Sequence, residues 1–181
     1  MTLPKTILVP TDFGEASQSA IDYAVGLAKT LGATVVLLHA YEIPVVGFPD
    51  GAMVVTADLG ERMLEGAQSG LDKELARISA RGVTVRSMVK QGDAWRSILD
   101  AAEEVGADLI VMGTHGRKGL PRVLIGSVAE KVVRTATIPV LTVHAGEIED
   151  MRDTLPEGKA PESEHTWKAH ATHENGVPSA R

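Results

Sequence analysis

Three glycines and a serine at fixed spacing are the residues best suited to binding chemistry: Gly113-x2-Gly116-x9-Gly126-Ser127. They follow the apolar run 109–112 and precede a segment with helical periodicity, which gives the order strand, glycine loop, helix start. The first turn of a helix exposes unpaired backbone N–H groups at the positive end of its dipole, and these groups bind anions, phosphate above all. The stretch therefore predicts a phosphate site, with the Ser127 hydroxyl beside a phosphate oxygen.

We expect the loop glycines to take positive φ values and to let the backbone approach a ligand closely. The same loop carries three basic residues, Arg117, Lys118 and Arg122. Their charge would offset that of phosphates, although basic residues on an exposed loop need no ligand. The loop has neither the Gly-Lys-Ser/Thr of a P-loop nor the dinucleotide pattern GxGxxG. A glycine-rich connection without a ligand is the alternative that the glycines alone leave open.

The composition of the chain limits its function classes. Its 181 residues suit one domain with an appendage. Residues 1–146 carry 14 Lys and Arg against 16 Asp and Glu, and residues 147–181 carry 4 against 8. Neither part has the basic surface that nucleic acid requires. The absence of cysteine excludes disulfides and thiol catalysis.

Strand and helix patterns alternate along residues 6–144. The expected strands are 6–10, 34–40, 83–90, 108–113 and 138–144, and the expected helices are 17–31, 58–81, 94–105 after an Asp93 cap, and one beginning at Ser127. This alternation predicts an α/β fold, a single Rossmann-like doubly wound sheet of five parallel strands with helices on both faces. The third strand alternates apolar and polar residues, as an edge strand does, which fits the order 3-2-1-4-5.

In this order the first and fourth strands are neighbours at the switch point, where open α/β sheets bind ligands. Asp12 and Gly113 end these two strands. The Asp12 carboxylate would accept hydrogen bonds from ribose hydroxyls or help to hold a metal beside phosphates. Its other interpretation is a cap for the loop and helix that follow, a position that aspartate favours.

The glycine signature resembles the nucleotide-binding motif of the universal stress protein family, in its ATP-binding branch. Residues 7–12 and 138–143 resemble that family's first and last strands, so the resemblance covers residues 3 to about 145. It implies the same strand order and an ATP site, in which the backbone at Ala40 contacts adenine. The other residues that it implies for the site are Pro10 and Thr11 around the base, Asp12 on the nucleotide, and Gly113, Gly116, Gly126, Ser127 and Val128 on ribose and phosphates. Arg117 is added to the predicted site for its charge, not for the resemblance.

The leading hypothesis is a stress-response regulator or sensor that binds ATP, with Mg²⁺ as a possible companion of the phosphates. A dimeric interaction scaffold that needs no nucleotide is the first alternative. Slow ATP hydrolysis is the second, but no residue stands out as a general base or as a positioner of attacking water. His115, in the loop, is expected to be solvated, and His39 to be packed and hydrogen-bonded.

The last strand, Ile138–His144, should form a sheet edge, and an exposed apolar edge invites pairing. The resemblance implies a homodimer through this strand, while protein partners stay unknown. We expect residues 1–146 to form the nucleotide-binding domain and the acidic tail 147–181 to be disordered. The long connection 41–57 would be a lid or a surface excursion. Without a signal-peptide pattern or an 18-residue apolar run, a soluble cytoplasmic protein is expected.

Overall fold

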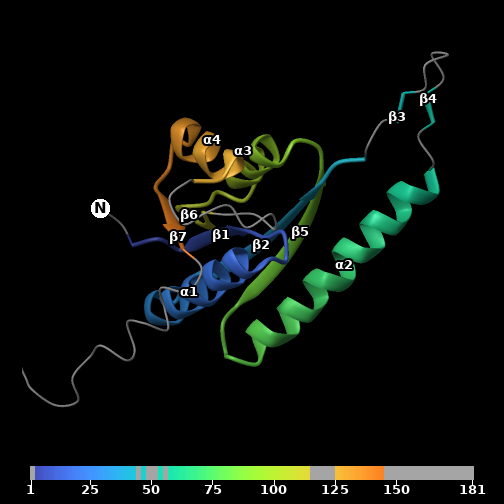
Figure 1. Ribbon diagram of the computed structural model, residues 1–181. Helices are drawn as coiled ribbons and strands as arrows, with labels where there is room; N and C mark the ends of the chain where they lie inside the picture. Colours follow the sequence, from blue (N-terminus) through green and yellow to red (C-terminus); the bar gives the residue numbers. More distant parts are fainter. Residues whose placement is uncertain (1–2, 44–45, 48–52, 55–56, 115–124, 145–181) are drawn as a thin grey trace, which may run out of the picture.

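A five-stranded parallel sheet forms the centre of the computed structural model, which describes residues 3–43, 46–47, 53–54, 57–114 and 125–144. The strand order is β5-β2-β1-β6-β7 (Figure 1). The strands are β1 (Thr6–Pro10), β2 (Thr34–Tyr41), β5 (Val85–Gln91), β6 (Leu109–Gly113) and β7 (Val140–Val143). Counted within the sheet, this is the order 3-2-1-4-5, so the predicted topology is confirmed.

Four helices cover the two faces of the sheet (Figure 1). On one face lie α1 (Glu15–Leu31) and α2 (Ala57–Ser79), and on the other lie α3 (Ala94–Glu104) and α4 (Ser127–Thr135). Successive strand residues pack on opposite faces of the sheet. Ile7 of β1 is buried with α1 and α2, and its neighbour Leu8 is buried with α3 and α4. This double burial explains why β1, β2 and β6 read as continuous apolar runs rather than as alternating ones.

The strand β5 is the edge that its alternating sequence predicts. It pairs in parallel with β2, from Val35 opposite Val85 to Tyr41 opposite Gln91, and no residue of β5 is fully buried. Among the described strands it has no neighbour on its other side. Its apolar residues Val85 and Val89 pack against the α1–α2 layer.

Helix α2 is longer than the strand that it covers. Its 23 residues span about 34 Å at roughly 1.5 Å per residue, whereas the 7 residues of β5 span about 23 Å at roughly 3.3 Å each. Its N-terminal half consequently runs past the end of the sheet, toward the short hairpin of β3 (Val46–Gly47) and β4 (Met53–Val54) (Figure 1). Leu71 and Ile78 are buried, but Leu59 is 37% exposed. The first turn of the helix therefore leaves its apolar residue partly exposed.

Two helix ends carry caps of the usual residue types. Gly32 follows α1 in the left-handed conformation, with φ of 67°, and its N–H donates to the Ala28 carbonyl, as glycine commonly does at a helix C-terminus. The Asp93 carboxylate accepts a hydrogen bond from the Trp95 N–H at 3.3 Å and caps α3, which confirms the predicted cap.

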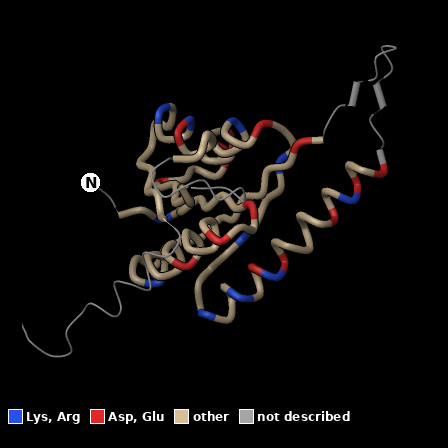
Figure 2. Tube along the Cα trace, in the orientation of Figure 1, with Lys and Arg blue, Asp and Glu red and all other residues tan. Residues whose placement is uncertain are grey.

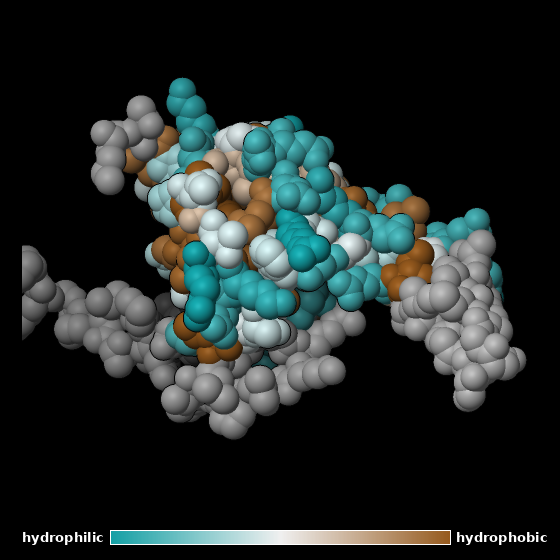
Figure 3. Space-filling model, turned by 90° about the horizontal axis from the view of Figure 1, so that it is seen from above, coloured by the Kyte–Doolittle hydropathy of each residue, from teal (hydrophilic) through white to brown (hydrophobic). Residues whose placement is uncertain are grey.

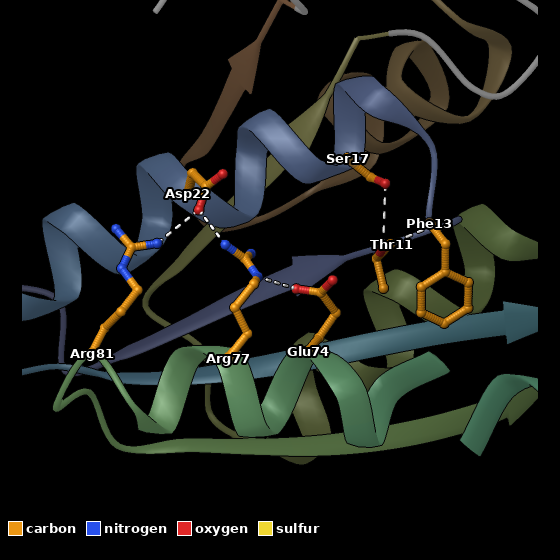
Figure 4. A network of polar contacts seen from close by, with 7 residues as sticks. All are labelled: Thr11, Phe13, Ser17, Asp22, Glu74, Arg77 and Arg81. Carbon is orange, nitrogen blue, oxygen red and sulfur yellow. Dashed lines mark hydrogen bonds and ion pairs between the residues drawn. The ribbon is translucent and has the colours of Figure 1, made fainter. Parts of the chain in front are cut away.

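A cluster of charged side chains joins helices α1 and α2, which cover the same face of the sheet (Figure 4). Asp22 of α1 accepts hydrogen bonds from Arg77 and Arg81, both at 2.7 Å, and Arg77 also donates to Glu74 at 2.9 Å. Partial burial acts to raise the pKa of Asp22, but hydrogen bonds and charges from the two arginines outweigh it and hold the pKa below its usual value. The cluster fixes the C-terminal half of α2 against α1.

Acidic and basic residues are interspersed along α2 (Figure 2). Seen from above, hydrophilic and hydrophobic side chains are interspersed on the described surface (Figure 3). Among the helices that the structure describes, none has the length and apolarity needed to cross a bilayer.

Candidate functional site

The candidate site lies at the sheet edge where β1 and β6 end. Leu8 pairs with Ile110 in parallel, so both strands reach this edge within three residues. β1 runs through Pro10 into Thr11 and Asp12, and β6 runs through Gly113 into Thr114. The switch point predicted from the strand order is therefore present, with Asp12 and Gly113 at its two sides.

The connection from β1 to α1 is held by hydrogen bonds within a few residues (Figure 4). Thr11 is buried; its N–H donates to the Leu38 carbonyl at 2.8 Å and its hydroxyl oxygen accepts from the Phe13 N–H at 3.0 Å. Asp12 Oδ1 accepts from the Gly14 N–H at 2.9 Å and from the Ser17 hydroxyl at 2.8 Å. Asp12 thus fixes the loop before α1, but no described side chain caps the helix itself, so the second interpretation holds for the loop and not for the helix.

The end of β2 supports this loop from the side. His39 Nδ1 lies 2.8 Å from the Thr11 carbonyl oxygen and donates to it, because a carbonyl can only accept. The ring of His39 also stacks on Phe13, with centroids 4.6 Å apart and planes at 26°. The prediction that His39 is packed and hydrogen-bonded is confirmed. Ala40, the next residue, is half-buried in β2.

Gly113 is a glycine because of packing. A Cβ atom at this position would lie 2.7 Å from both the carbonyl carbon and the oxygen of Ala16 in the first turn of α1. The glycines with positive φ in the described chain are Gly32, Gly82, Gly92 and Gly106. Gly113 is not among them, and Gly126 has φ of −61° and ψ of 150°. The prediction of positive φ was therefore wrong for Gly113 and for Gly126. Gly113 instead allows the close approach of α1, and Gly126 is an N-cap with extended backbone.

The start of α4 carries backbone donors that have no partner within the helix. Gly126 is the N-cap, no side chain of the described residues caps this end, and the first helical bond runs from the Glu130 N–H to the Gly126 carbonyl. The N–H groups of Ser127, Val128 and Ala129 consequently have no acceptor within the helix. The Gly126 N–H itself donates to the Thr114 carbonyl at 2.6 Å, which attaches the helix start to the end of β6.

Thr114 is a residue that the sequence analysis did not single out. It is 1% exposed, its N–H donates to the Val143 carbonyl at 3.1 Å, and its hydroxyl lies 2.8 Å from His144 Nδ1. It therefore ties the ends of β6, β7 and α4 together. The Ser17 hydroxyl likewise ties the loop between β1 and α1, because it bonds Asp12 and the Gly14 carbonyl. Small hydroxyl residues beside strand ends commonly bond nearby backbone or side chains, and this tendency is the signal that would have pointed to both.

The predicted site residues divide into two groups. Seven of them lie at the ends of β1 and β6 and the start of α4, namely Pro10, Thr11, Asp12, Gly113, Gly126, Ser127 and Val128, and Ala40 lies on the neighbouring strand β2. Gly116 and Arg117 fall outside the described residues, as do His115, Lys118 and Arg122. Over the described ranges, no three His, Asp or Glu side chains come together as a metal site would require.

Comparison with known proteins gives a consistent result. The sequence model of the universal stress protein family matches residues 4–144. A universal stress protein of Methanocaldococcus jannaschii is 37% identical over 143 residues, which are 78% of this chain and 82% of that protein. A universal stress protein of Lactobacillus plantarum has the same fold, with a TM-score of 0.69 at 24% identity over 79% of this chain and 99% of that one. A universal stress protein solved in complex with cAMP has a TM-score of 0.59 at 26% identity, over 80% and 99% of the two chains. With its fold and most of its length matched, this chain belongs to the universal stress protein family.

Proposed function

We propose that the chain binds an adenine nucleotide, with ATP as the expected ligand, where β1 and β6 end, and that occupancy regulates its interactions under stress. The observation that supports this most is the start of α4, where three backbone N–H groups have no acceptor in the helix and no side chain caps them. Such a helix start attracts phosphate. The related protein solved with cAMP supports the choice of an adenine nucleotide.

The proposed contacts follow the resemblance to the family. Adenine would contact the backbone at Ala40, beside Pro10 and Thr11. Asp12 would accept hydrogen bonds from the ribose, and its carboxylate is held in place by Gly14 and Ser17. The phosphates would lie along Gly113 and Gly126 and would accept from the N–H groups of Ser127 and Val128, with Gly116 and Arg117 completing the loop.

Mg²⁺ would accompany the phosphates rather than occupy a site made by the protein alone. The described residues offer no group of three metal ligands, and Mg²⁺ in nucleotide sites is held mainly by phosphate oxygens, water and one or two carboxylates. Asp12 is the carboxylate at this edge that would approach it. The ion would supply charge neutralisation for the triphosphate.

A homodimer through residues 138–144 is part of the proposal. β7 pairs with β6 on one side and ends the sheet on the other, so its outer backbone groups face away from the described strands. A dimeric scaffold that works without nucleotide is the competing function. The edge at β7 fits the nucleotide-binding dimer and the scaffold equally well.

The test of nucleotide binding is a denaturing extraction of freshly purified protein, with the released small molecules identified by mass spectrometry. We expect ATP in near-stoichiometric amount. ADP as the main product would call for a turnover assay and would favour hydrolysis. An empty extract, followed by no binding in a calorimetric titration with ATP, would contradict the proposal and favour the scaffold.

A further inference from the structure

Phe13 has an unusual backbone conformation next to the candidate site. Its φ is 62°, the one positive value among the non-glycine residues that the structure describes. This left-handed region favours glycine and asparagine and is uncommon for a bulky aromatic residue. Such conformations persist only where the surrounding structure holds them, and they concentrate at functional sites.

Two contacts hold the Phe13 side chain. Its ring stacks on His39, whose Nδ1 is fixed by the Thr11 carbonyl. The ring also reaches helix α2 at Gly70. A Cβ at Gly70 would lie 2.7 Å from Phe13 Cζ and 2.9 Å from Cε1, so only glycine leaves room for the ring there.

A displaced Phe13 ring would disturb the contacts of the loop. It would change the stacking on His39, which is bonded to Thr11. The Phe13 N–H is also bonded to the Thr11 hydroxyl, and the adjacent Asp12 carboxylate holds Gly14 and Ser17. The position of Asp12 is therefore coupled, through Phe13, to the packing of α2 on the sheet.

We propose that Phe13 is a positioning residue of the nucleotide site: in contact with both His39 and Gly70, it sets the Asp12 carboxylate and makes nucleotide affinity depend on α2. This inference rests on the proposed function, since it concerns the same site.

A matched pair of glycine substitutions in α2 tests the inference. Gly70→Ala would force a methyl group against the Phe13 ring, whereas Gly66→Ala, one turn earlier in the same helix, meets nothing within 4 Å. Both changes raise helix propensity equally. The ATP dissociation constant of each variant would be measured by calorimetry at 25 °C, beside melting temperatures without ligand.

We expect Gly66→Ala to bind ATP as the wild type does and Gly70→Ala to bind about three- to tenfold more weakly. Phe13→Leu should weaken binding as well. In the Phe13→Leu background, Gly70→Ala should have little further effect, because the smaller side chain leaves room for the methyl group. That non-additivity would show that the two residues act through one contact.

Equal dissociation constants for Gly70→Ala and Gly66→Ala, measured on folded proteins, would overturn the positioning role. A purely structural contact would lower the melting temperature of Gly70→Ala and leave the dissociation constant unchanged, which also counts against it. Failure of the wild type to bind any adenine nucleotide would instead contradict the proposed function, so the two failures are distinguishable.

Discussion

At Gly113 the missing side chain allows the first turn of α1 to pack directly on the end of β6. The residue belongs to the glycine signature, yet the contact that requires glycine is to Ala16 and not to a ligand. Packing and binding are compatible here, because the close approach of α1 brings its start to the edge where α4 also begins. A motif glycine can thus shape a site without touching the molecule bound there.

Substituting Gly113 by alanine should destabilise the fold. The new methyl group would overlap backbone atoms of Ala16, which cannot rotate away as a side chain can, and we expect a loss of about 1–3 kcal/mol in the free energy of unfolding. Gly26→Ala is the control, because this exposed glycine within α1 meets nothing within 4 Å and should gain up to about 1 kcal/mol. Urea denaturation compares them, and equal stabilities would refute the packing role.

Residue contacts of this kind are what the sequence could not predict. The hydroxyl of Ser17 on Asp12 and the stacking of Phe13 on His39 depend on side-chain positions that only the assembled loop defines. Gly70 is 57 positions from Phe13, and nothing in its neighbours distinguishes it from Gly66. By contrast, Asp12 at the end of β1 was predictable, because an apolar strand that ends in a polar residue marks the sheet edge.

At the scale of the elements, residue patterns predicted most of the architecture. Continuous apolar runs identified β1, β2 and β6 as covered on both faces, and alternation identified β5 as an edge. The sequence could not predict which turns of α2 lie on the sheet, because helical periodicity records which side of a helix is apolar and not where the sheet beneath it ends. Leu59 lies past that end and is 37% exposed.

The starts of β1 and β6 are joined by one carboxylate. Asp108 Oδ2 accepts hydrogen bonds from the N–H groups of Lys5 at 2.8 Å and Thr6 at 3.0 Å, and these bonds hold the pKa of Asp108 below its usual value. A carboxyl with a lowered folded-state pKa stabilises the fold above its unfolded pKa, and this contribution is lost as the pH falls through the folded pKa. The strand junction should therefore weaken in acid.

Asp108→Asn should be less stable than the wild type at pH 7, because the amide accepts these hydrogen bonds without a negative charge. The difference should begin to shrink as the pH falls below about 4, the pKa of an aspartate in the unfolded chain, and should be lost as the pH falls through the lower folded-state pKa. Thermal melts of both proteins across this range measure it. A stability difference that stays constant with pH would show that the charge of Asp108 contributes nothing.

At the scale of the whole molecule, the open side of β7 decides how copies would associate. The Pro139 carbonyl accepts a hydrogen bond from the Ile110 N–H of β6, and the Val143 carbonyl accepts one from the Thr114 N–H. Pro139 and Val143 therefore direct their backbone groups toward β6. Backbone groups alternate along a strand, and Thr142 consequently directs its N–H outward. Its donor would serve a partner strand and not the sheet of its own chain.

Thr142→Pro should convert the proposed dimer into a monomer. Proline removes the outward N–H and is tolerated in an edge strand. Thr142→Val keeps the donor and serves as the control. Light scattering coupled to size-exclusion chromatography gives the mass of each protein. A wild-type monomer, or a dimer that survives the proline, would contradict association through this strand.

Nucleotide binding where β1 and β6 end is tested most directly by titrating the ¹⁵N-labelled protein with ATP and recording its amide signals in two-dimensional NMR spectra. For a nucleotide site at this edge, we expect saturable chemical-shift changes at the ends of β1 and β6 and the start of α4. The affected residues should be Thr11, Asp12, Gly113, Ser127 and Val128. Asp108, at the opposite end of β6, should not move. Unchanged spectra at millimolar ATP, or shifts that spare this edge, would contradict a nucleotide site there.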